Sequence, residues 1–308
     1  MQHRYGGPET LEVEEVERPT AGIGEVLVRV RAAALNPTDY VVMRGFLRMQ
    51  SGWRRPKQQV RGFDAAGTIE AVGAGVADLA LGDAVFGSCR GSFAEYALSA
   101  ADKIARKPER LSFEQAAGIA VAGTMALNGL RDHAQLRDGQ RVAITGATGG
   151  VGSFAVQIAK AYGADVTAVC RTENVELARE LGADHVFDYT RDDYLRGDRY
   201  DAIFDNGGGR SLRELRRALA PGGVVVLNCG QDISLALAGV LARLIRRRGD
   251  VKQFVRKVTR PDLLELAALA EDGRLTPVVD RTYPLAETRA AMTYLMARHP
   301  RGKVVVTL

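Results

Sequence analysis

The chain is poor in the residues that bind metal ions or form disulfide bonds. It has three cysteines and four histidines among 308 residues. Cys89, Cys170 and Cys229 are far apart and odd in number, so they predict neither a disulfide framework nor a zinc cluster. A Zn²⁺ site needs three or four ligands held together, so we expect no metal in the functional site. We expect a reducing, cytoplasmic environment.

Long apolar runs and a strong charge of one sign are also missing. The longest apolar candidate, 233–245, contains Arg243 and is followed by three more arginines. It is shorter than the roughly 18 residues of a membrane-spanning helix. A helix on a membrane surface stays open, but we favour a helix packed against a substrate cleft or a subunit partner. The net charge of +5 and the absence of a basic stripe with aromatics predict no nucleic-acid binding and no membrane association.

The residues that are present describe a globular α/β protein of two domains. The first third predicts strands separated by glycines and prolines, at 11–16, 25–33, 67–72 and 93–98. From Phe113 helices alternate with short apolar strands, which we place at 142–144, 166–169, 185–187, 202–204 and 224–227. Such alternation predicts a parallel sheet covered on both faces.

The last part of the chain predicts a return to the first domain. An amphipathic segment at 263–270 precedes a strand-like piece through 278, a helix at 286–296 and a closing strand at 303–308. That closing strand has no β-α-β partner and must pair at another edge. We therefore predict a discontinuous β-rich domain, 1–119 with 262–308, and an inserted doubly wound parallel-sheet domain, 120–261.

A glycine-rich turn after the strand at 142–144 is the most specific signal. Its spacing is Ala147-x-Gly149-x-x-Gly152, and an apolar helical segment follows it. Small residues let the backbone turn sharply and approach a pyrophosphate, which then meets the N–H groups at the helix start. We expect a dinucleotide site on six consecutive residues, Ala147, Thr148, Gly149, Gly150, Val151 and Gly152.

The residues after the neighbouring strands predict the kind of dinucleotide. Arg171 and Thr172 follow the second strand, where a guanidinium suits a 2′-phosphate, so we expect NADPH. Glu173 is the alternative contact, to the ribose hydroxyls of NADH. The turns after the fourth and fifth strands add the expected cofactor contacts Asn206, Gly207, Cys229 and Gly230.

Six motifs stand in one order along the chain. They are Asn-Pro-Thr-Asp-Tyr at 36–40, Gly-Phe-Asp-Ala-Ala-Gly at 62–67, Ala-Gly-Thr-Met-Ala-Leu at 122–127, the glycine turn, Leu-Gly-Ala-Asp-His-Val at 181–186 and Arg-Gly-Lys-Val-Val at 301–305. In this order the chain resembles the medium-chain dehydrogenases/reductases, in their zinc-free, zeta-crystallin-like quinone oxidoreductase branch. The resemblance implies a GroES-like β-rich catalytic domain, a Rossmann domain with a cleft between them, and a homodimer that reduces quinones or activated enones with NADPH. Zinc-dependent relatives carry a cysteine near Asn36, Gly-His-Glu in place of 62–64 and a four-cysteine lobe, none of which is present.

The resemblance also implies roles for single residues. Asn36 and Tyr40 would line the acceptor pocket, the first orienting a carbonyl and the second donating a proton or hydrogen bond. Thr124 would contact the nicotinamide, and Tyr189 the 2′-phosphate or adenine. Asn174 would contact the cofactor where some relatives have a phosphate-binding lysine, and the missing lysine favours NADPH less. The plainer interpretations are a turn signal for Asn36 and a core aromatic for Tyr40.

Other interpretations stay open. We expect Lys303 to reach the cofactor, although a surface lysine on an edge strand fits the pattern better. A zinc-free alcohol/ketone oxidoreductase is a second enzymatic alternative. Relatives of one subgroup have a lysine near Val41, and its absence here leaves room for an NADPH-binding scaffold or redox sensor with little turnover.

Overall fold

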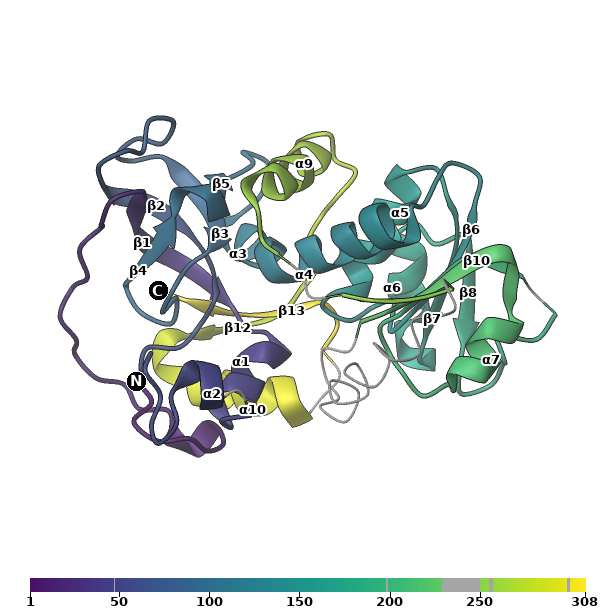
Figure 1. The fold of residues 1–308 in the computed structure, drawn as a ribbon, viewed down its shortest axis with the longest axis horizontal. Helices are drawn as coiled ribbons and strands as arrows, with labels where there is room; N and C mark the ends of the chain where they lie inside the picture. The colour runs from purple at the N-terminus through teal and green to yellow at the C-terminus, as the bar shows by residue number, and fades with distance from the viewer. Residues whose placement is uncertain (47, 198, 229–249, 255–256, 298–299) are drawn as a thin grey trace. The chain divides into compact units, whose positions relative to one another are not determined.

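The computed structural model describes all residues except 47, 198, 229–249, 255–256 and 298–299 (Figure 1). The chain forms two compact units. Unit 1 comprises residues 1–124 and 258–308, and unit 2 comprises residues 125–257. The boundaries predicted above, 119/120 and 261/262, differ from these by five and four residues.

Unit 1 is built on a seven-stranded sheet of order β12-β13-β1-β2-β3-β5, with β4 paired to β1. The closing strand β13 pairs antiparallel with β1 and parallel with β12, so it lies inside the sheet and not at its edge. The bounds are β1 (Glu25–Ala34), β2 (Asp64–Val72), β3 (Ala84–Ser88), β4 (Tyr96–Ala100), β5 (Ile104–Arg106), β12 (Val279–Pro284) and β13 (Lys303–Thr307).

Helices of unit 1 pack on this sheet through apolar side chains. One cluster joins α10 to the sheet and to α1, with Leu35, Met43, Met292 and Val304 buried. The bounds are α1 (Pro37–Met43), α2 (Arg48–Ser51), α3 (Phe113–Ala117), α4 (Ile119–Leu127, which begins in unit 1), α9 (Arg260–Glu271) and α10 (Thr288–Ala297). The helices expected at 263–270 and 286–296 are therefore present as α9 and α10.

The strand predicted at 11–16 is wrong. Residues 11–22 form no strand, and the side chains of Val13 and Val16 are 69% and 45% exposed. Glutamates alternate with these valines, so the period-two pattern resembles a half-buried strand. Without a neighbouring strand to bond, the segment stays extended on the surface.

Unit 2 is a six-stranded parallel sheet of order β11-β10-β9-β6-β7-β8. This is the doubly wound order, whose switch point lies between β6 and β9. The bounds are β6 (Arg141–Thr145), α5 (Gly152–Ala161), β7 (Asp165–Cys170), α6 (Val175–Glu180), β8 (His185–Asp188), β9 (Tyr200–Asp205), α7 (Leu212–Arg217), β10 (Leu219–Leu227) and β11 (Val251–Gln253), and a π-helical segment spans Asn128–Ala134. All five predicted strands are confirmed, and β11 is additional.

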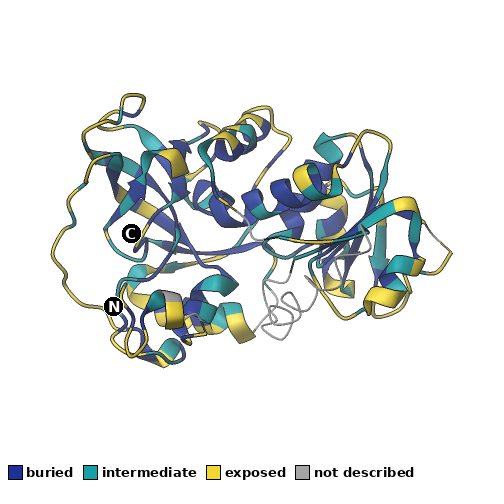
Figure 2. Cartoon of the chain, in the orientation of Figure 1, coloured by how far each residue is buried: buried dark blue, intermediate teal, exposed yellow. Residues whose placement is uncertain are grey.

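Burial explains why this sheet sits in the middle of unit 2. The inner residues of β6, β7 and β9 are almost fully buried, as is the apolar face of α5 (Figure 2). Strands buried on both faces read as continuous apolar runs, which is why the sequence reveals them. No helix in the described ranges has the length and apolar character that crossing a membrane requires.

Candidate functional site

The glycine turn between β6 and α5 leaves no room for side chains at one position. A Cβ on Gly152 would lie 2.0 Å from the carbonyl oxygen of Gly146. Gly146 itself has φ of +60°, a conformation that favours glycine. A Cβ on Gly149, in contrast, would have its nearest neighbouring atom at 3.4 Å, so the missing side chain leaves space in the turn. The backbone is thus shaped as a phosphate-binding turn requires, with α5 starting at Gly152.

A hydroxyl at the end of β6 ties this turn to the end of β9. Thr145 donates from Oγ1 to Oδ1 of Asp205 at 2.6 Å. The same Oγ1 accepts the backbone N–H groups of Asn206 and Gly207, at 2.9 and 2.8 Å. The two strand ends that flank the switch point are therefore fixed to each other, with Asn206 and Gly207 beside the glycine turn.

Replacing Thr145 by valine keeps the shape of the side chain and removes these three hydrogen bonds. We expect Thr145→Val to lower the free energy of unfolding by about 1–3 kcal/mol, because buried polar partners lose their bonds, and to weaken dinucleotide binding. Urea unfolding and a fluorescence titration measure the two effects. Thr167→Val in β7 is the control, since the Thr167 hydroxyl has no hydrogen-bond partner among the described residues. If Thr145→Val and Thr167→Val are equally stable, the Thr145 hydroxyl does not tie the ends of β6 and β9 together.

The ends of β7 and β8 bring together residues expected at the 2′-phosphate. Arg171 donates from Nε to the hydroxyl of Tyr189 at 2.5 Å, and this bond raises the pKa of Arg171. Thr172 donates to the carboxylate of Asp188 at 2.5 Å, and hydrogen bonds from Thr172 and Thr190 hold the pKa of Asp188 below its usual value. Asp188 thereby joins the two loops and presents Arg171 and Tyr189 side by side.

The residues next to Arg171 in the sequence differ in their burial. Glu173 is exposed, whereas Asn174 is buried at the start of α6. Burial, with the charges of Asp188 and Glu173, raises the pKa of the Cys170 thiol to about 11. The thiol therefore stays protonated at neutral pH and is a weak nucleophile.

In unit 1, Asn36 lies in a buried network of charges. The carboxylate of Asp39 accepts the backbone N–H of Asn36 at 2.8 Å and thus caps α1, which starts at Pro37. The Asn36 side chain turns inward: its Nδ2 donates to Oδ2 of Asp64 at 3.1 Å and, more weakly, to the Ala34 carbonyl at 3.4 Å. Its Oδ1 accepts from Nζ of Lys303 at 2.6 Å.

Lys303 and Asp64 are buried, like the Asn36 amide that lies between them. Their side chains are 3% and 0% exposed, and Nζ of Lys303 lies 4.0 Å from Oδ2 of Asp64. The alternative of an exposed lysine on an edge strand is wrong, because β13 has a partner on each side and Nζ also donates to the Leu35 carbonyl at 3.0 Å. This Nζ is directed to partners within unit 1.

Tyr40 and Thr124 are placed differently. Tyr40 is half-buried on α1, packs against the cluster of Leu35 and Met43, and has no hydrogen bond to its hydroxyl in the described part of the chain. Thr124 is fully buried in α4, and its hydroxyl donates to the carbonyl of Ala120 at 2.5 Å. That hydroxyl can still accept a hydrogen bond.

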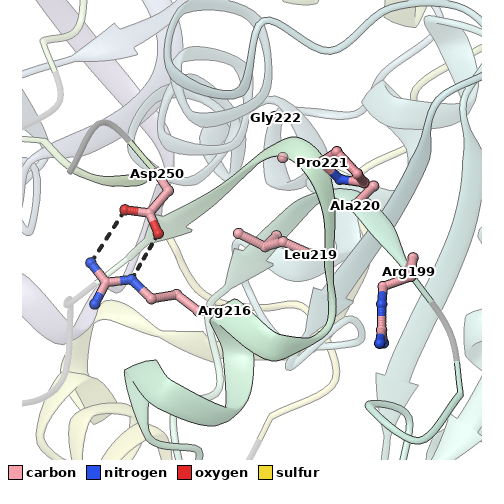
Figure 3. A pocket seen from close by; sticks show the side chains of 8 residues that line it. Arg199, Arg216, Leu219, Ala220, Pro221, Gly222 and Asp250 are labelled. Atoms are coloured by element: carbon pink, nitrogen blue, oxygen red, sulfur yellow. Dashed lines mark hydrogen bonds and ion pairs between the residues drawn. The ribbon is translucent and has the colours of Figure 1, made fainter.

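A surface pocket of about 520 Å³ lies at the amino ends of strands of the parallel sheet (Figure 3). Arg199, Leu219 and Asp250, which line it, stand at the amino ends of β9, β10 and β11. Arg216 enters from α7 and donates to both carboxylate oxygens of Asp250, at 2.8 and 3.2 Å. Since dinucleotides bind at the carboxyl ends of such strands, this pocket is separate from the glycine turn.

Potential metal ligands gather at one place within the described residues. His3, Glu12 and Glu14 lie on the surface with ligand atoms within 4.8 Å of one another. No residue of the network around Asn36 belongs to this group. The expected contacts Cys229 and Gly230, and the segment 233–245, lie outside the described residues.

Three carboxylates that position these residues were not predicted from the sequence. Asp64, Asp188 and Asp205 each stand at one end of a strand and accept hydrogen bonds there. The available signal was their position at the ends of apolar strands, where a carboxylate that becomes buried requires partners. Asn36, the partner of Asp64, and Thr145, the partner of Asp205, lie far away in the sequence, so the sequence alone does not show these contacts.

Comparison with known proteins agrees with this geometry. Residues 22–109 match the family model "Alcohol dehydrogenase GroES-like domain", and residues 181–306 match "Zinc-binding dehydrogenase". The chain is 34% identical to the chloroplastic NADPH-dependent alkenal/one oxidoreductase of Arabidopsis thaliana, over 98% of this chain and 77% of that protein. It is 30% identical to the quinone oxidoreductase of Sus scrofa, over 99% and 96% of the two chains.

Among solved structures, the quinone oxidoreductase from Coxiella burnetii is similar, with a TM-score of 0.86 and 28% sequence identity. The match covers 100% of this chain and 98% of that one. Both the GroES-like domain and the parallel sheet predicted from the sequence are confirmed. The chain therefore belongs to the medium-chain dehydrogenase/reductase family, in the quinone oxidoreductase branch.

Proposed function

We propose that the protein is a zinc-independent oxidoreductase that transfers a hydride from NADPH to a quinone or an α,β-unsaturated carbonyl compound. The observation that carries the cofactor assignment is the pair Arg171 and Tyr189 at the carboxyl ends of β7 and β8. In the doubly wound fold the adenosine ribose binds at the carboxyl ends of these strands. A fixed guanidinium there binds phosphate oxygens through several N–H groups.

The turn between β6 and α5 fits the pyrophosphate of the same cofactor. The space at Gly149 and the N–H groups at the start of α5 suit two phosphates, and Asn206 and Gly207 would contact the ribose or carboxamide. NADPH supplies the hydride when bound. The chain's part is to bind and orient it and to keep water away from the reacting atoms.

On the acceptor side, we assign Asn36 and Tyr40 to the pocket and Thr124 to the nicotinamide. The weak 3.4 Å bond from Asn36 to the Ala34 carbonyl is the one that an acceptor carbonyl could replace. The Tyr40 hydroxyl is a donor for the acceptor oxygen as negative charge develops there. A quinone or enone needs no stronger acid than this, because its reduced form takes its proton from solvent.

The donor set supports the proposed zinc independence. Phe63 precedes Asp64 at the start of β2, and phenylalanine offers no ligand atom. The stretch 181–306, matched by the zinc-binding family model, holds one cysteine and two histidines. A catalytic zinc requires three protein ligands close together.

Activity should therefore survive removal of metal ions. We expect dialysis against a strong chelator to leave kcat for any accepted quinone or enone unchanged, and added Zn²⁺ not to raise it. Metal analysis of the same sample is the control for complete removal. A loss of activity that stoichiometric Zn²⁺ restores would contradict zinc independence.

The assay that tests the proposed function is oxidation of NADPH at 340 nm with a panel of quinones and enones, beside NADH and simple secondary alcohols. Turnover of an enone or quinone supports the reductase, whereas turnover of alcohols alone supports the second enzymatic alternative. Tight NADPH binding without turnover of any acceptor supports the scaffold. A thiol-based sensor is disfavoured for the described cysteines, because burial raises the pKa of Cys89 to about 12 and that of Cys170 to about 11.

The proposal includes a cytoplasmic homodimer. Sedimentation equilibrium tests the oligomeric state. A stable monomer at micromolar concentration would reject the dimer without touching the enzymatic proposal.

A further inference from the structure

We propose that Lys303 is a positioning residue for the acceptor site, holding the amide of Asn36 in one orientation between two buried charges. The inference rests on the proposed function, because it assigns the amide a role in placing the acceptor. It differs from the expectation that Lys303 reaches the cofactor. Lys303 lies in β13, 267 residues after Asn36 in the sequence.

The contacts leave one orientation for the Asn36 amide. Its oxygen faces the ammonium of Lys303 at 2.6 Å, and its nitrogen faces the carboxylate of Asp64 at 3.1 Å. A flipped amide would set its N–H groups against a cation and its oxygen against an anion. Both contacts would then be repulsive, and in a buried site such repulsion is weakly screened.

The ammonium of Lys303 is held in turn by its backbone partner. It donates to the Leu35 carbonyl at 3.0 Å, directly before Asn36 in the chain. Lys303 thus fixes both the backbone before the asparagine and the amide at its tip. Asp39 fixes the backbone N–H of the same residue, so three charged groups define the position of Asn36.

The network extends to the helix that carries Thr124. Oδ2 of Asp64 accepts the backbone N–H of Val121 in α4 at 3.3 Å, in addition to the amide of Asn36. Thr124 lies one turn further along the same helix. Loss of the Lys303 charge would remove the cation that lies 4.0 Å from Oδ2 of Asp64, and the amide and the start of α4 would then be held less firmly.

A buried charge pair of this kind adds little to net stability, because the cost of removing both charges from water offsets their attraction. The charge pair instead selects one orientation of the Asn36 amide. The site is dry, since the neighbouring Cys89 is 1% exposed, and burial, followed by the charge of Asp64, raises the pKa of its thiol to about 12. An amide held in such surroundings keeps its direction during the reaction.

The test compares four proteins: wild type, Lys303→Met, the double variant Lys303→Met/Asp64→Asn, and Lys107→Met. The double variant removes both buried charges together, so the Asp64 carboxylate does not remain after the Lys303 charge is lost. Lys107 is the matched control, since its Nζ also donates to two backbone carbonyls of unit 1, those of Pro108 and Leu111, and touches no proposed site residue.

We expect Lys303→Met to lower kcat about 10- to 100-fold, the cost of misplacing a site group by about 1 Å, with KM for NADPH changed less than about twofold. The double variant should recover the melting temperature and not kcat. Lys107→Met should match wild type in kcat. If the double variant regains kcat with stability, or if Lys303→Met keeps wild-type kcat, Lys303 acts on folding alone and the proposal is overturned.

A second readout does not depend on turnover. In ¹⁵N-labelled protein the side-chain amide signal of Asn36 is assigned by its loss in Asn36→Asp. We expect Lys303→Met to shift this signal and to speed its hydrogen exchange at least about tenfold, and Lys107→Met to leave it unchanged. An unchanged signal in Lys303→Met overturns the positioning role. If wild type reduces no acceptor while Lys303→Met shows the expected shift and exchange, the proposed function is refuted, and only the orientation of the Asn36 amide by Lys303 is retained.

Discussion

Arg171→Gln should raise KM for NADPH about 10- to 100-fold and leave KM for NADH within about twofold. The reason is the loss of charge-assisted hydrogen bonds to the 2′-phosphate, a group that NADH lacks. Arg171 is fixed for this contact by its hydrogen bond to Tyr189. Steady-state kinetics at 340 nm with both cofactors and one saturating acceptor measure the effect.

Arg179→Gln is the matched control for a lost positive charge. Arg179 is an exposed arginine of α6 that pairs with Glu176 on the same helix. Its substitution should leave the preference between the two cofactors unchanged. If Arg171→Gln raises KM equally for NADPH and NADH, Arg171 does not bind the 2′-phosphate. Wild-type preference for NADH would instead move the ribose contact to Glu173.

Gly152→Ala should lower kcat/KM for NADPH about 10²-fold, because the glycine turn proposed to hold the pyrophosphate must move by about 1 Å to accept a side chain. A Cβ at this position would meet the Gly146 oxygen at 2.0 Å and the Ala147 Cα at 2.8 Å, both backbone atoms. Such overpacking also costs about 1–3 kcal/mol of stability. Kinetics and the thermal unfolding of unit 2 measure both effects.

Gly149→Ala separates the effect on NADPH binding from the effect on stability. Its Cβ would lie at ordinary contact distance, 3.4 Å from the nearest atom outside its neighbours, and its φ is not positive. We expect wild-type stability with weaker NADPH binding, because the methyl group occupies space that the pyrophosphate needs. A Gly152→Ala protein with wild-type stability and kcat/KM would show that this turn does not hold the cofactor.

Local chemistry explains what could be predicted from the sequence. The glycine turn and the five parallel strands are visible because burial on both faces makes short apolar runs, and because the turn needs small residues at fixed spacing. The segment at 11–16 has the same local alternation as a strand and failed for lack of a partner. Pairing, unlike propensity, depends on residues far away in the chain.

The buried charges could not be predicted for the same reason. Lys303 lies in a run of valines at the end of the chain, where a lysine is typical of an exposed edge. Its burial follows from β12, which covers the outer side of β13, and from the two partners Leu35 and Asn36. Asp205 likewise acts through Thr145 on the neighbouring strand β6, and Asp188 acts through Thr172, which follows the neighbouring strand β7.

The central claim is hydride transfer from NADPH to a quinone or enone. Its most direct test is single-turnover oxidation of NADPH deuterated at C4, followed at 340 nm with one quinone and one enone. We expect NADPH to be oxidised by at least one of them, with a rate that falls on deuteration of the transferred position. Protein that binds NADPH yet oxidises it with neither acceptor, at any concentration up to saturation, would contradict the account.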